Sequence, residues 1–343
     1  MTVHRRMEVV DRLRGLAAAA MILGHSFIVY PVNIAQVPWC SAIQHFIYTF
    51  HMELFFVLAG VVYHCTDYPG FLRKKAERIL LPYVFFGVAA VVLKAYGGRA
   101  VNESESIEAG MLRLLLYGGN YWFLYVLFLL FFLFPWIEKL CKSRKKELLL
   151  GAGLLLLQEV IQLPDLLMVA YCVYYLPYFI AGRWLGIGWE RAWEEKEAGK
   201  KGRIARIGAD ILLYVLIELV RIFGELEPGA VLKFIRGMAV ISVLYELLQW
   251  LPLTSAVRRM LTDCGKFSLQ LYLFNGYLLT IFRVIICQLL GIRSPFIIVM
   301  GIWIGNLVIT LLVCNYLLPY IPLLRECCGI RREGGHKDGK KRG

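Results

Sequence analysis

The sequence lacks the short motifs by which many soluble enzymes hold nucleotides, metals or nucleophiles. It contains no P-loop, no dinucleotide-binding glycine cluster, no HExxH metal site and no GxSxG nucleophile turn. Its nine cysteines form no CxxC pair, and only Cys40 falls in a predicted outward loop, so an external disulfide framework is excluded. We therefore predict no metal ligands and no bound cofactor.

Charged residues are also scarce, and long apolar runs take their place. Only 18% of the 343 residues are charged, whereas 59% are hydrophobic. A soluble domain of this length would not carry so many unbroken apolar stretches. The sequence therefore predicts an all-α integral membrane protein with about ten transmembrane helices. The predicted spans are 13–30, 46–64, 79–97, 119–136, 147–162, 166–185, 204–223, 231–251, 267–290 and 296–318.

The net charge of +13 follows a membrane topology rather than a nucleic-acid surface. Lys and Arg concentrate in the segments that should face the cytoplasm, whereas the predicted outward loops 31–45 and 224–230 contain none. This positive-inside pattern predicts an N-in, C-in orientation and attraction to membrane lipid, with no nucleic-acid partner. We expect one membrane domain over residues 1–320 and a basic, disordered cytoplasmic tail over 321–343.

An ionisable side chain lies inside the first predicted span. In the stretch DRLRGLAAAAMILGH, about three helical turns and a rise of roughly 16 Å separate Arg14 from His25, so both lie on one helix face. A histidine at that depth is costly and indicates function, although a hydrogen bond to a neighbouring helix would also explain it. Arg14 alone is equally typical of an anchor at the inner end of a span.

A carboxylate is predicted at the same depth on the second span. Placing the spans in a hydrocarbon core of about 30 Å brings Glu53 level with His25, where it could pair with the imidazole and raise its basicity. His51, near the outer end, is a second and weaker candidate. Taken with Arg14, this arrangement favours an active site over purely structural pairing.

Other polar and aromatic residues are predicted in the outer half of the membrane. Trp122 could stack on a sugar ring, although interfacial aromatic residues are more often anchors. A group of charged residues could bind hydroxyls or an anionic sugar, or could pair with one another to hold helices together. Its members are Glu218, Arg221, Lys233, Arg236 and Arg283.

Two motifs, DRLRGLAAAAMILGH and FHMELFFVLAG, together resemble the acyltransferase-3 family of membrane acyltransferases. Weaker matches extend the resemblance to essentially all ten spans: RKKAERILLPY (73–83), YWFLYVLFLLFF (121–132) and SLQLYLFNGYL (268–278). The resemblance implies a multi-pass enzyme of the bacterial cytoplasmic membrane. It also implies transfer of an acyl group, by family expectation acetyl, from cytoplasmic acyl-CoA to a hydroxyl of an extracytoplasmic or exported carbohydrate.

The resemblance also implies roles for particular residues. His25 would be the family's essential histidine, Arg14 its partner at the cytoplasmic mouth, and Glu53 falls where many members have an Asp. Arg73 and Arg78 match the basic residues before the third helix. There they would bind the phosphates of the donor, although an inner-loop anchor is the plainer interpretation. His25 would act as a general base or carry the acyl group.

Two positions depart from the family pattern. Ala59 stands where a serine usually precedes the glycine at Gly60, which we interpret as a packing change. Asn275 stands where many members have a second histidine. Asn can form hydrogen bonds, so Asn275 stays among the predicted residues that bind substrate or donor. It cannot exchange a proton at neutral pH, so a second titrating group is in doubt.

A transporter or flippase is the competing hypothesis, in which the same residues would line a polar pathway without covalent chemistry. No internal repeat is visible, which counts against a transporter built from inverted repeats. The spacing of Arg14 and His25, joined to FHMELFF, favours the enzyme.

Overall fold

The computed structural model describes residues 2–97, 105–194 and 200–330, and within these ranges every regular element is helical, which confirms the all-α prediction there. Short π and 3₁₀ turns extend several of the α-helices: η1 (Ala76–Leu80), η3 (Gly119–Tyr121), η4 (Leu166–Met168), η5 (Val284–Leu289), η6 (Val313–Leu317) and η7 (Leu318–Tyr320). The α-helices are α1 (Thr2–His25), α2 (Pro38–Tyr48), α3 (His51–Val61), α4 (Tyr68–Lys75), α5 (Leu81–Tyr96), α6 (Ile107–Tyr117), α7 (Trp122–Cys141), α8 (Arg144–Val160), α9 (Val169–Glu194), α10 (Lys200–Gly224), α11 (Ala230–Trp250), α12 (Ser255–Lys266), α13 (Ser268–Arg283), α14 (Pro295–Leu312) and α15 (Pro322–Cys327).

Six helical stretches in the described residues are long and apolar enough to cross a membrane, fewer than the ten predicted spans. All ten predicted spans fall on helices, but four of them do not meet both conditions. Helix α8 has only 17 residues, and α1, α10 and α11 each carry several charged side chains. The count of ten crossings therefore stays a prediction. The six stretches are Pro38–Val61, Tyr68–Tyr96, Ile107–Cys141, Leu166–Gly186, Ser268–Leu289 and Pro295–Tyr320.

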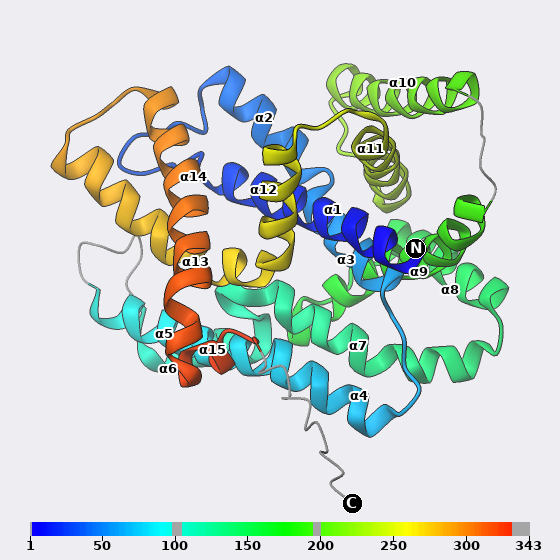
Figure 1. Ribbon diagram of the computed structural model, residues 1–343, viewed down its shortest axis with the longest axis horizontal. Helices are drawn as coiled ribbons and strands as arrows, with labels where there is room; N and C mark the ends of the chain where they lie inside the picture. The colour runs from blue at the N-terminus through cyan, green and yellow to red at the C-terminus, as the bar shows by residue number, and fades with distance from the viewer. Residues whose placement is uncertain (1, 98–104, 195–199, 331–343) are drawn as a thin grey trace, which may run out of the picture.

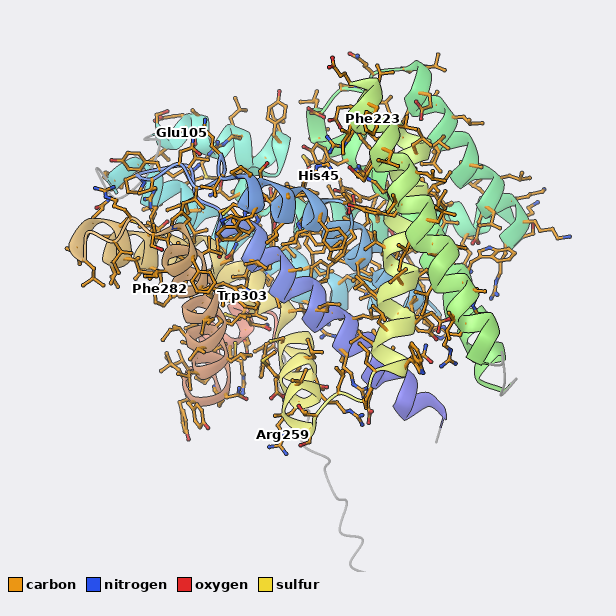
Figure 2. The ribbon with its side chains drawn as sticks, turned by 90° about the horizontal axis from the view of Figure 1, so that it is seen from above. His45, Glu105, Phe223, Arg259, Phe282 and Trp303 are labelled. Carbon is orange, nitrogen blue, oxygen red and sulfur yellow. The ribbon has the colours of Figure 1, made fainter. Side chains whose placement is uncertain are left out.

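Segments predicted to face opposite sides of the membrane lie at opposite edges of the molecule. His45, Glu105 and Phe223, in or next to predicted outward loops, lie along one edge, and Arg259 of a predicted inner segment lies at the other (Figure 2). Helix α1 crosses the middle of the molecule and packs against α12 (Figure 1). The assignment of these edges to cytoplasm and exterior stays a prediction.

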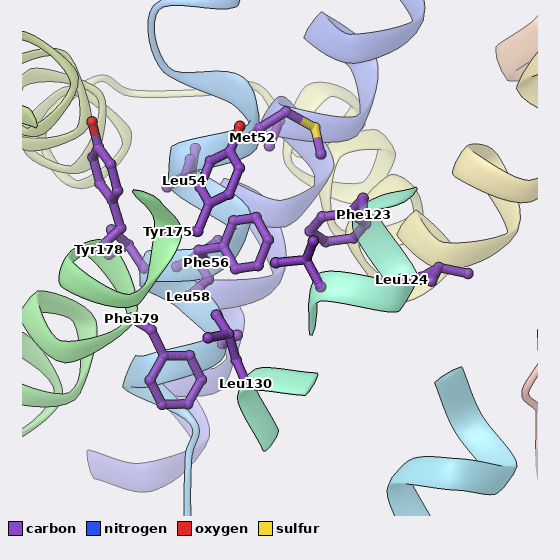
Figure 3. Packing of buried hydrophobic residues seen from close by; sticks show 14 of the residues in the cluster. Met52, Leu54, Phe56, Leu58, Phe123, Leu124, Leu130, Tyr175, Tyr178 and Phe179 are labelled. Carbon is purple, nitrogen blue, oxygen red and sulfur yellow. The ribbon is translucent and has the colours of Figure 1, made fainter. Parts of the chain in front are cut away.

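Helix α3 is the most enclosed element, because all of its residues except Phe55 are buried. Aromatic rings from neighbouring helices surround it (Figure 3). Phe56 stacks on Tyr175 of α9 with ring centroids 4.2 Å apart, and meets Phe123 of α7 edge to face at 5.2 Å. Aromatic pairs of this kind add to the stabilisation from burial. The core therefore forms around the helix that carries His51 and Glu53.

Glycines allow the two helices of the predicted site to approach their partners very closely. A Cβ at Gly60 of α3 would meet the backbone carbonyl of Phe179 on α9, and one at Gly182 of α9 would meet that of Val57. A Cβ at Gly15 of α1 would likewise meet a backbone carbonyl of α12. Small residues permit such backbone contact between helices in membranes. Backbone packing therefore fixes the positions of α1 and α3.

The first helix ends earlier than the first predicted span. Ser26 Oγ donates to the carbonyl of Ile22 at 2.8 Å, and Gln44 Nε2 of α2 donates to the carbonyl of Gly24 at 3.0 Å. The bond from Gln44 satisfies a carbonyl of the last turn, where a helix leaves such groups without helical partners. His25 therefore lies at the end of the helix and not within it.

The chain beyond α14 packs on the membrane domain as far as residue 330. Helix α15 buries Cys327, and the carbonyl of the buried Cys328 accepts a hydrogen bond from Gln270 Nε2 of α13 at 2.7 Å. The first ten residues of the predicted tail are therefore part of the fold. The prediction of disorder for residues 331–343 lies outside the described residues.

Candidate active site

His25 is exposed although Gly24 and Ser26 on either side of it are buried. Its ring centroid lies 6.2 Å from that of Tyr48 on α2. Among the described residues, no hydrogen bond or ion pair holds its imidazole. Both ring nitrogens of His25 are therefore available to a ligand.

His51, the first residue of α3, is buried and close to the same tyrosine. Its Nδ1 lies 2.9 Å from the carbonyl oxygen of Ile47, and its ring centroid lies 5.1 Å from that of Tyr48. A carbonyl only accepts hydrogen bonds, so Nδ1 carries a proton and, in the neutral ring, Nε2 keeps a free lone pair. His51, the weaker candidate from the sequence, is therefore the residue that shares a neighbour with His25.

Glu53 is bonded to α9 rather than to the histidine of α1. Its Oε1 accepts a hydrogen bond from the hydroxyl of Tyr174 at 3.3 Å, and its Oε2 has no partner in the described part of the chain. The positive charges of Lys233 and Arg236 on α11 lie close enough to act on this buried carboxylate. Two residues along a helix turn a side chain by about 200°. Glu53 therefore faces α9 and α11, whereas His51 faces α2, and the expected pairing of Glu53 with His25 is absent.

Glu218 of α10 is the centre of an ion-pair network in the predicted outer half. Its carboxylate lies 2.7 Å from Arg236 Nη1, 2.8 Å from Arg221 Nε and 3.1 Å from His45 Nε2. The network joins α2, α10 and α11. These charges therefore hold helices together, which is one of the two interpretations that the sequence allows. Arg283 of α13 lies apart from it, with its guanidinium carbon 5.8 Å from the ring centroid of Tyr30.

Basic residues of α1, α4 and η1 form a second cluster around Arg14. Arg14 Nη1 lies 3.4 Å from Asp11 Oδ1, and the charges of Lys75 and Arg78 are close enough to interact with that of Arg14. Three cations with one carboxylate leave an excess of positive charge. The structure thus brings together Arg14, Lys75 and Arg78, all from segments that the sequence predicts at the inner face.

Arg73 does not join this cluster. Its side chain is exposed and its Nε lies 3.0 Å from Glu77 Oε1, one helical turn along. Lys75, two residues later on the opposite side of the helix, lies with Nζ 3.7 Å from the ring centroid of Phe131. The direction of each side chain around α4 decides which of the two basic residues meets α1.

Asn275 of α13 is buried and touches α1 one turn before His25. Its Nδ2 lies 3.6 Å from the sulfur of Met21, and its Oδ1 accepts a hydrogen bond from Asn306 Nδ2 of α14 at 2.9 Å. Asn275 therefore links α13 and α14 to the turn of α1 that precedes His25, and contributes no titrating group.

Trp122, at the start of α7, is half-buried among aromatic rings. Its ring centroid lies 5.0 Å from that of Tyr171 and 5.7 Å from that of Tyr175, both on α9. Tyr175 in turn stacks on Phe56 of α3. Trp122 therefore extends the aromatic packing around α3, away from the His25–Tyr48 contact.

Two tyrosines near the site are not singled out by the sequence. Tyr48 precedes His51 by three residues, a spacing that places side chains together on a continuous helix, so a signal for it exists. Tyr174 is 121 residues from Glu53 along the chain, and nothing in the sequence connects the two.

Comparison with known protein families gives one result that covers almost the whole molecule. A family model described as an acyltransferase domain, the acyltransferase-3 model, matches residues 8–318. No match was found among curated proteins or among solved structures. The matched segment includes both histidines, Glu53 and the basic cluster.

Proposed function

The chain belongs to the acyltransferase-3 family, and on this premise we propose that it transfers an acetyl group from cytoplasmic acetyl-CoA to a hydroxyl of an extracytoplasmic carbohydrate. One observation carries the proposal: His25 offers an exposed imidazole without partners in the described residues, at the end of a helix that bears Arg14, in a basic cluster, about three turns earlier. The two residues lie on one face of α1, separated by a rise of roughly 16 Å.

The basic cluster is the proposed site for the nucleotide end of the donor. Phosphates are recognised by guanidinium and ammonium groups, and Arg14, Lys75 and Arg78 supply three of them. The pantetheine arm is long and nearly neutral, so it could extend from the cluster toward His25. The thioester would then reach the imidazole while the phosphates remain at the membrane boundary.

The proposed reaction uses His25 as a general base. The acceptor hydroxyl gives its proton to the unprotonated nitrogen of His25, and its oxygen forms a bond to the thioester carbonyl carbon. The carbon–sulfur bond breaks, and the leaving CoA thiolate takes the proton back from the imidazolium. Tyr48 would position the imidazole during these steps, and His51 would in turn hold the Tyr48 ring that it contacts.

The acceptor is proposed to bind near Glu53. This buried carboxylate has one oxygen without a partner in the described residues, and Lys233 lies within electrostatic range of it. Carboxylates and ammonium groups bind sugar hydroxyls as acceptors and donors, respectively. Because Glu53 faces α9 and α11 whereas His51 faces α2, a sugar held there would have to extend across α3 to bring a hydroxyl to His25.

The membrane arrangement in this proposal is N-in and C-in, with about ten crossings in a bacterial cytoplasmic membrane. The positive-inside distribution supports the orientation. Acetyl-CoA would then enter from the face that bears the basic cluster, and the carbohydrate from the opposite face.

The direct test uses membranes that contain either the wild type or His25→Ala at matched protein levels. Radiolabelled acetyl-CoA is added, and the label in envelope carbohydrate is measured. Label that appears with the wild type and is lost with the variant supports the proposal. Equal label in both contradicts a role for His25. Absence of label in both, with membranes that demonstrably bind acetyl-CoA, contradicts the enzyme and favours the transporter or flippase.

A second measurement separates the two roles open to His25. Purified protein is incubated with labelled acetyl-CoA in the absence of carbohydrate. A general base leaves the protein unlabelled, whereas label attached to His25 would show that the imidazole carries the acyl group.

A further inference from the structure

A polar pocket lies between the N-terminal half of α1 and helix α12, at the edge of the molecule that carries Arg259 (Figure 2). Its volume is about 480 Å³, and three arginines line it: Arg12 from α1, and Arg258 and Arg259 from α12. None of the residues in the proposed reaction belongs to this pocket.

The charges of the pocket favour an anion. Arg12 is only 8% exposed, and its Nε has no partner in the described part of the chain. Its Nη2 pairs with Glu8 at 2.6 Å, which neutralises one carboxylate of the lining. Arg258 and Arg259 are exposed and form no ion pair among the described residues, while Asp263 supplies one opposing charge. A buried guanidinium N–H without an acceptor is unfavourable, so an anion that accepts a hydrogen bond from Arg12 would be stabilised here.

The backbone of α12 adds to this preference. The helix begins at Ser255, and Thr254 caps it by accepting a hydrogen bond from the amide of Val257 at 3.3 Å. The remaining amides of the first turn and the helix dipole favour negative charge at this end. Ser255 and Thr262 add hydroxyl groups to the lining. Arginines, hydroxyls and a helix start together form a set of donors suited to phosphate.

The pocket lies across α1 from the proposed donor site. Arg12 and Arg14 are two residues apart, and their side chains therefore point about 200° apart around the helix. Only Arg14 shares the helix face of His25. A phosphate bound by Arg12 is therefore not on the path from Arg14 to the imidazole.

We propose that this pocket binds the phosphate of an anionic phospholipid at the membrane boundary. Helix α12 exposes Val257 and Met260 beside its arginines, the combination expected of a helix that lies in the membrane interface. The bound phosphate would bridge Arg12 of α1 to the arginines of α12. Because Gly15 already brings these two helices into backbone contact, the lipid would clamp the helix that ends at His25.

The test compares lipid binding by the wild type, the double variant Arg258→Gln/Arg259→Gln and the control Lys142→Gln/Lys145→Gln. All four substituted residues are exposed, so both variants should fold, and each loses two positive charges. Binding of short-chain phosphatidylglycerol to detergent-purified protein is measured by native mass spectrometry. We expect the arginine variant to bind at least about tenfold more weakly than the wild type, and the lysine variant to match the wild type.

Parallel titrations identify the ligand. Phosphatidylcholine should bind much more weakly than phosphatidylglycerol, and acetyl-CoA should not displace the bound lipid. Equal binding by the arginine variant, or equal binding of the two lipids, would overturn the proposal. If inorganic phosphate raised the thermal unfolding temperature as much as phosphatidylglycerol does, the pocket would be assigned to a soluble anion. Displacement by acetyl-CoA would assign it to the donor. Either of these last two results would overturn the proposal that the ligand is a phospholipid.

Discussion

Tyr48 is a neighbour of both histidines of the site, with its ring centroid 6.2 Å from that of His25 and 5.1 Å from that of His51. Its hydroxyl contacts the Gly24 carbonyl at 3.4 Å, a long hydrogen bond. The ring, rather than the hydroxyl, therefore provides most of what Tyr48 contributes to the position of the imidazole.

Replacing Tyr48 should separate these two contributions. We expect Tyr48→Phe to keep acetyl transfer within a few-fold of the wild type, because the ring contacts remain. Tyr48→Ala should lower kcat by about 10- to 100-fold, since small displacements of a reacting group cost rates of this order. Steady-state transfer kinetics measure both effects. Equal losses in the two variants would show instead that the hydroxyl is required.

Lys75 and Arg73 offer a matched pair of charge removals near the donor site. Lys75 lies in the cluster with Arg14, whereas Arg73 is exposed and paired with Glu77. We expect Lys75→Gln to raise KM for acetyl-CoA about tenfold, the loss of one charge-assisted contact. Arg73→Gln should change it by less than about threefold, as exposed ion pairs contribute little. The reverse order of effects would place the phosphates at Arg73.

The Glu218–Arg236 pair should contribute to stability more than to chemistry. Glu218→Leu removes the only acceptor of Arg236 that lies within ion-pair distance in the described residues, and should cost about 3–5 kcal/mol of unfolding free energy. The double variant Glu218→Leu/Arg236→Met should be less destabilised than Glu218→Leu alone. Denaturant unfolding in detergent measures these differences. Additive costs in the double variant would mean that the two charges do not interact.

The helix contact at Gly60 predicts a clear difference between two glycine substitutions. Gly60→Ala places a Cβ against the backbone of Phe179 and should destabilise the protein by about 1–3 kcal/mol. Gly153→Ala on α8, where a Cβ meets nothing within 4 Å, should be neutral or stabilise by up to about 1 kcal/mol. Thermal unfolding of both variants at matched detergent concentration is the measurement. Comparable stability of the two would contradict the close approach of α3 and α9.

Periodicity and composition predict the helical class, and the resemblance of the two motifs predicts the family that the comparison confirms. The spacing of Arg14 and His25 also places both residues correctly on one face of α1. The end of that helix could not be predicted, because the groups that cap it, Gln44 above all, come from a segment that follows an irregular loop. Apolar residues continue past His25, so hydropathy gives no sign that the helix stops.

The partners of Glu53 were equally beyond prediction. Depth in the membrane follows from counting residues along a helix, whereas the direction of a side chain depends on how each helix is rotated against its neighbours. Glu53 and His51 lie on one short helix but face different partners for this reason. The same rotation turns Lys75 toward the basic cluster and Arg73 away from it. The positions of the basic residues in the sequence do not predict this difference.

The near-complete burial of α3 limits the substitutions that this chain can accept during evolution. A helix with only Phe55 at its surface has almost no position where a substitution can be neutral, so its eleven residues can change only together with the helices around them. A library of all single substitutions should therefore show its lowest tolerance along α3, including positions that carry no chemistry. Descendants of this protein could acquire new acceptors through substitutions in loops and peripheral helices, while the sequence of α3 would stay nearly unchanged.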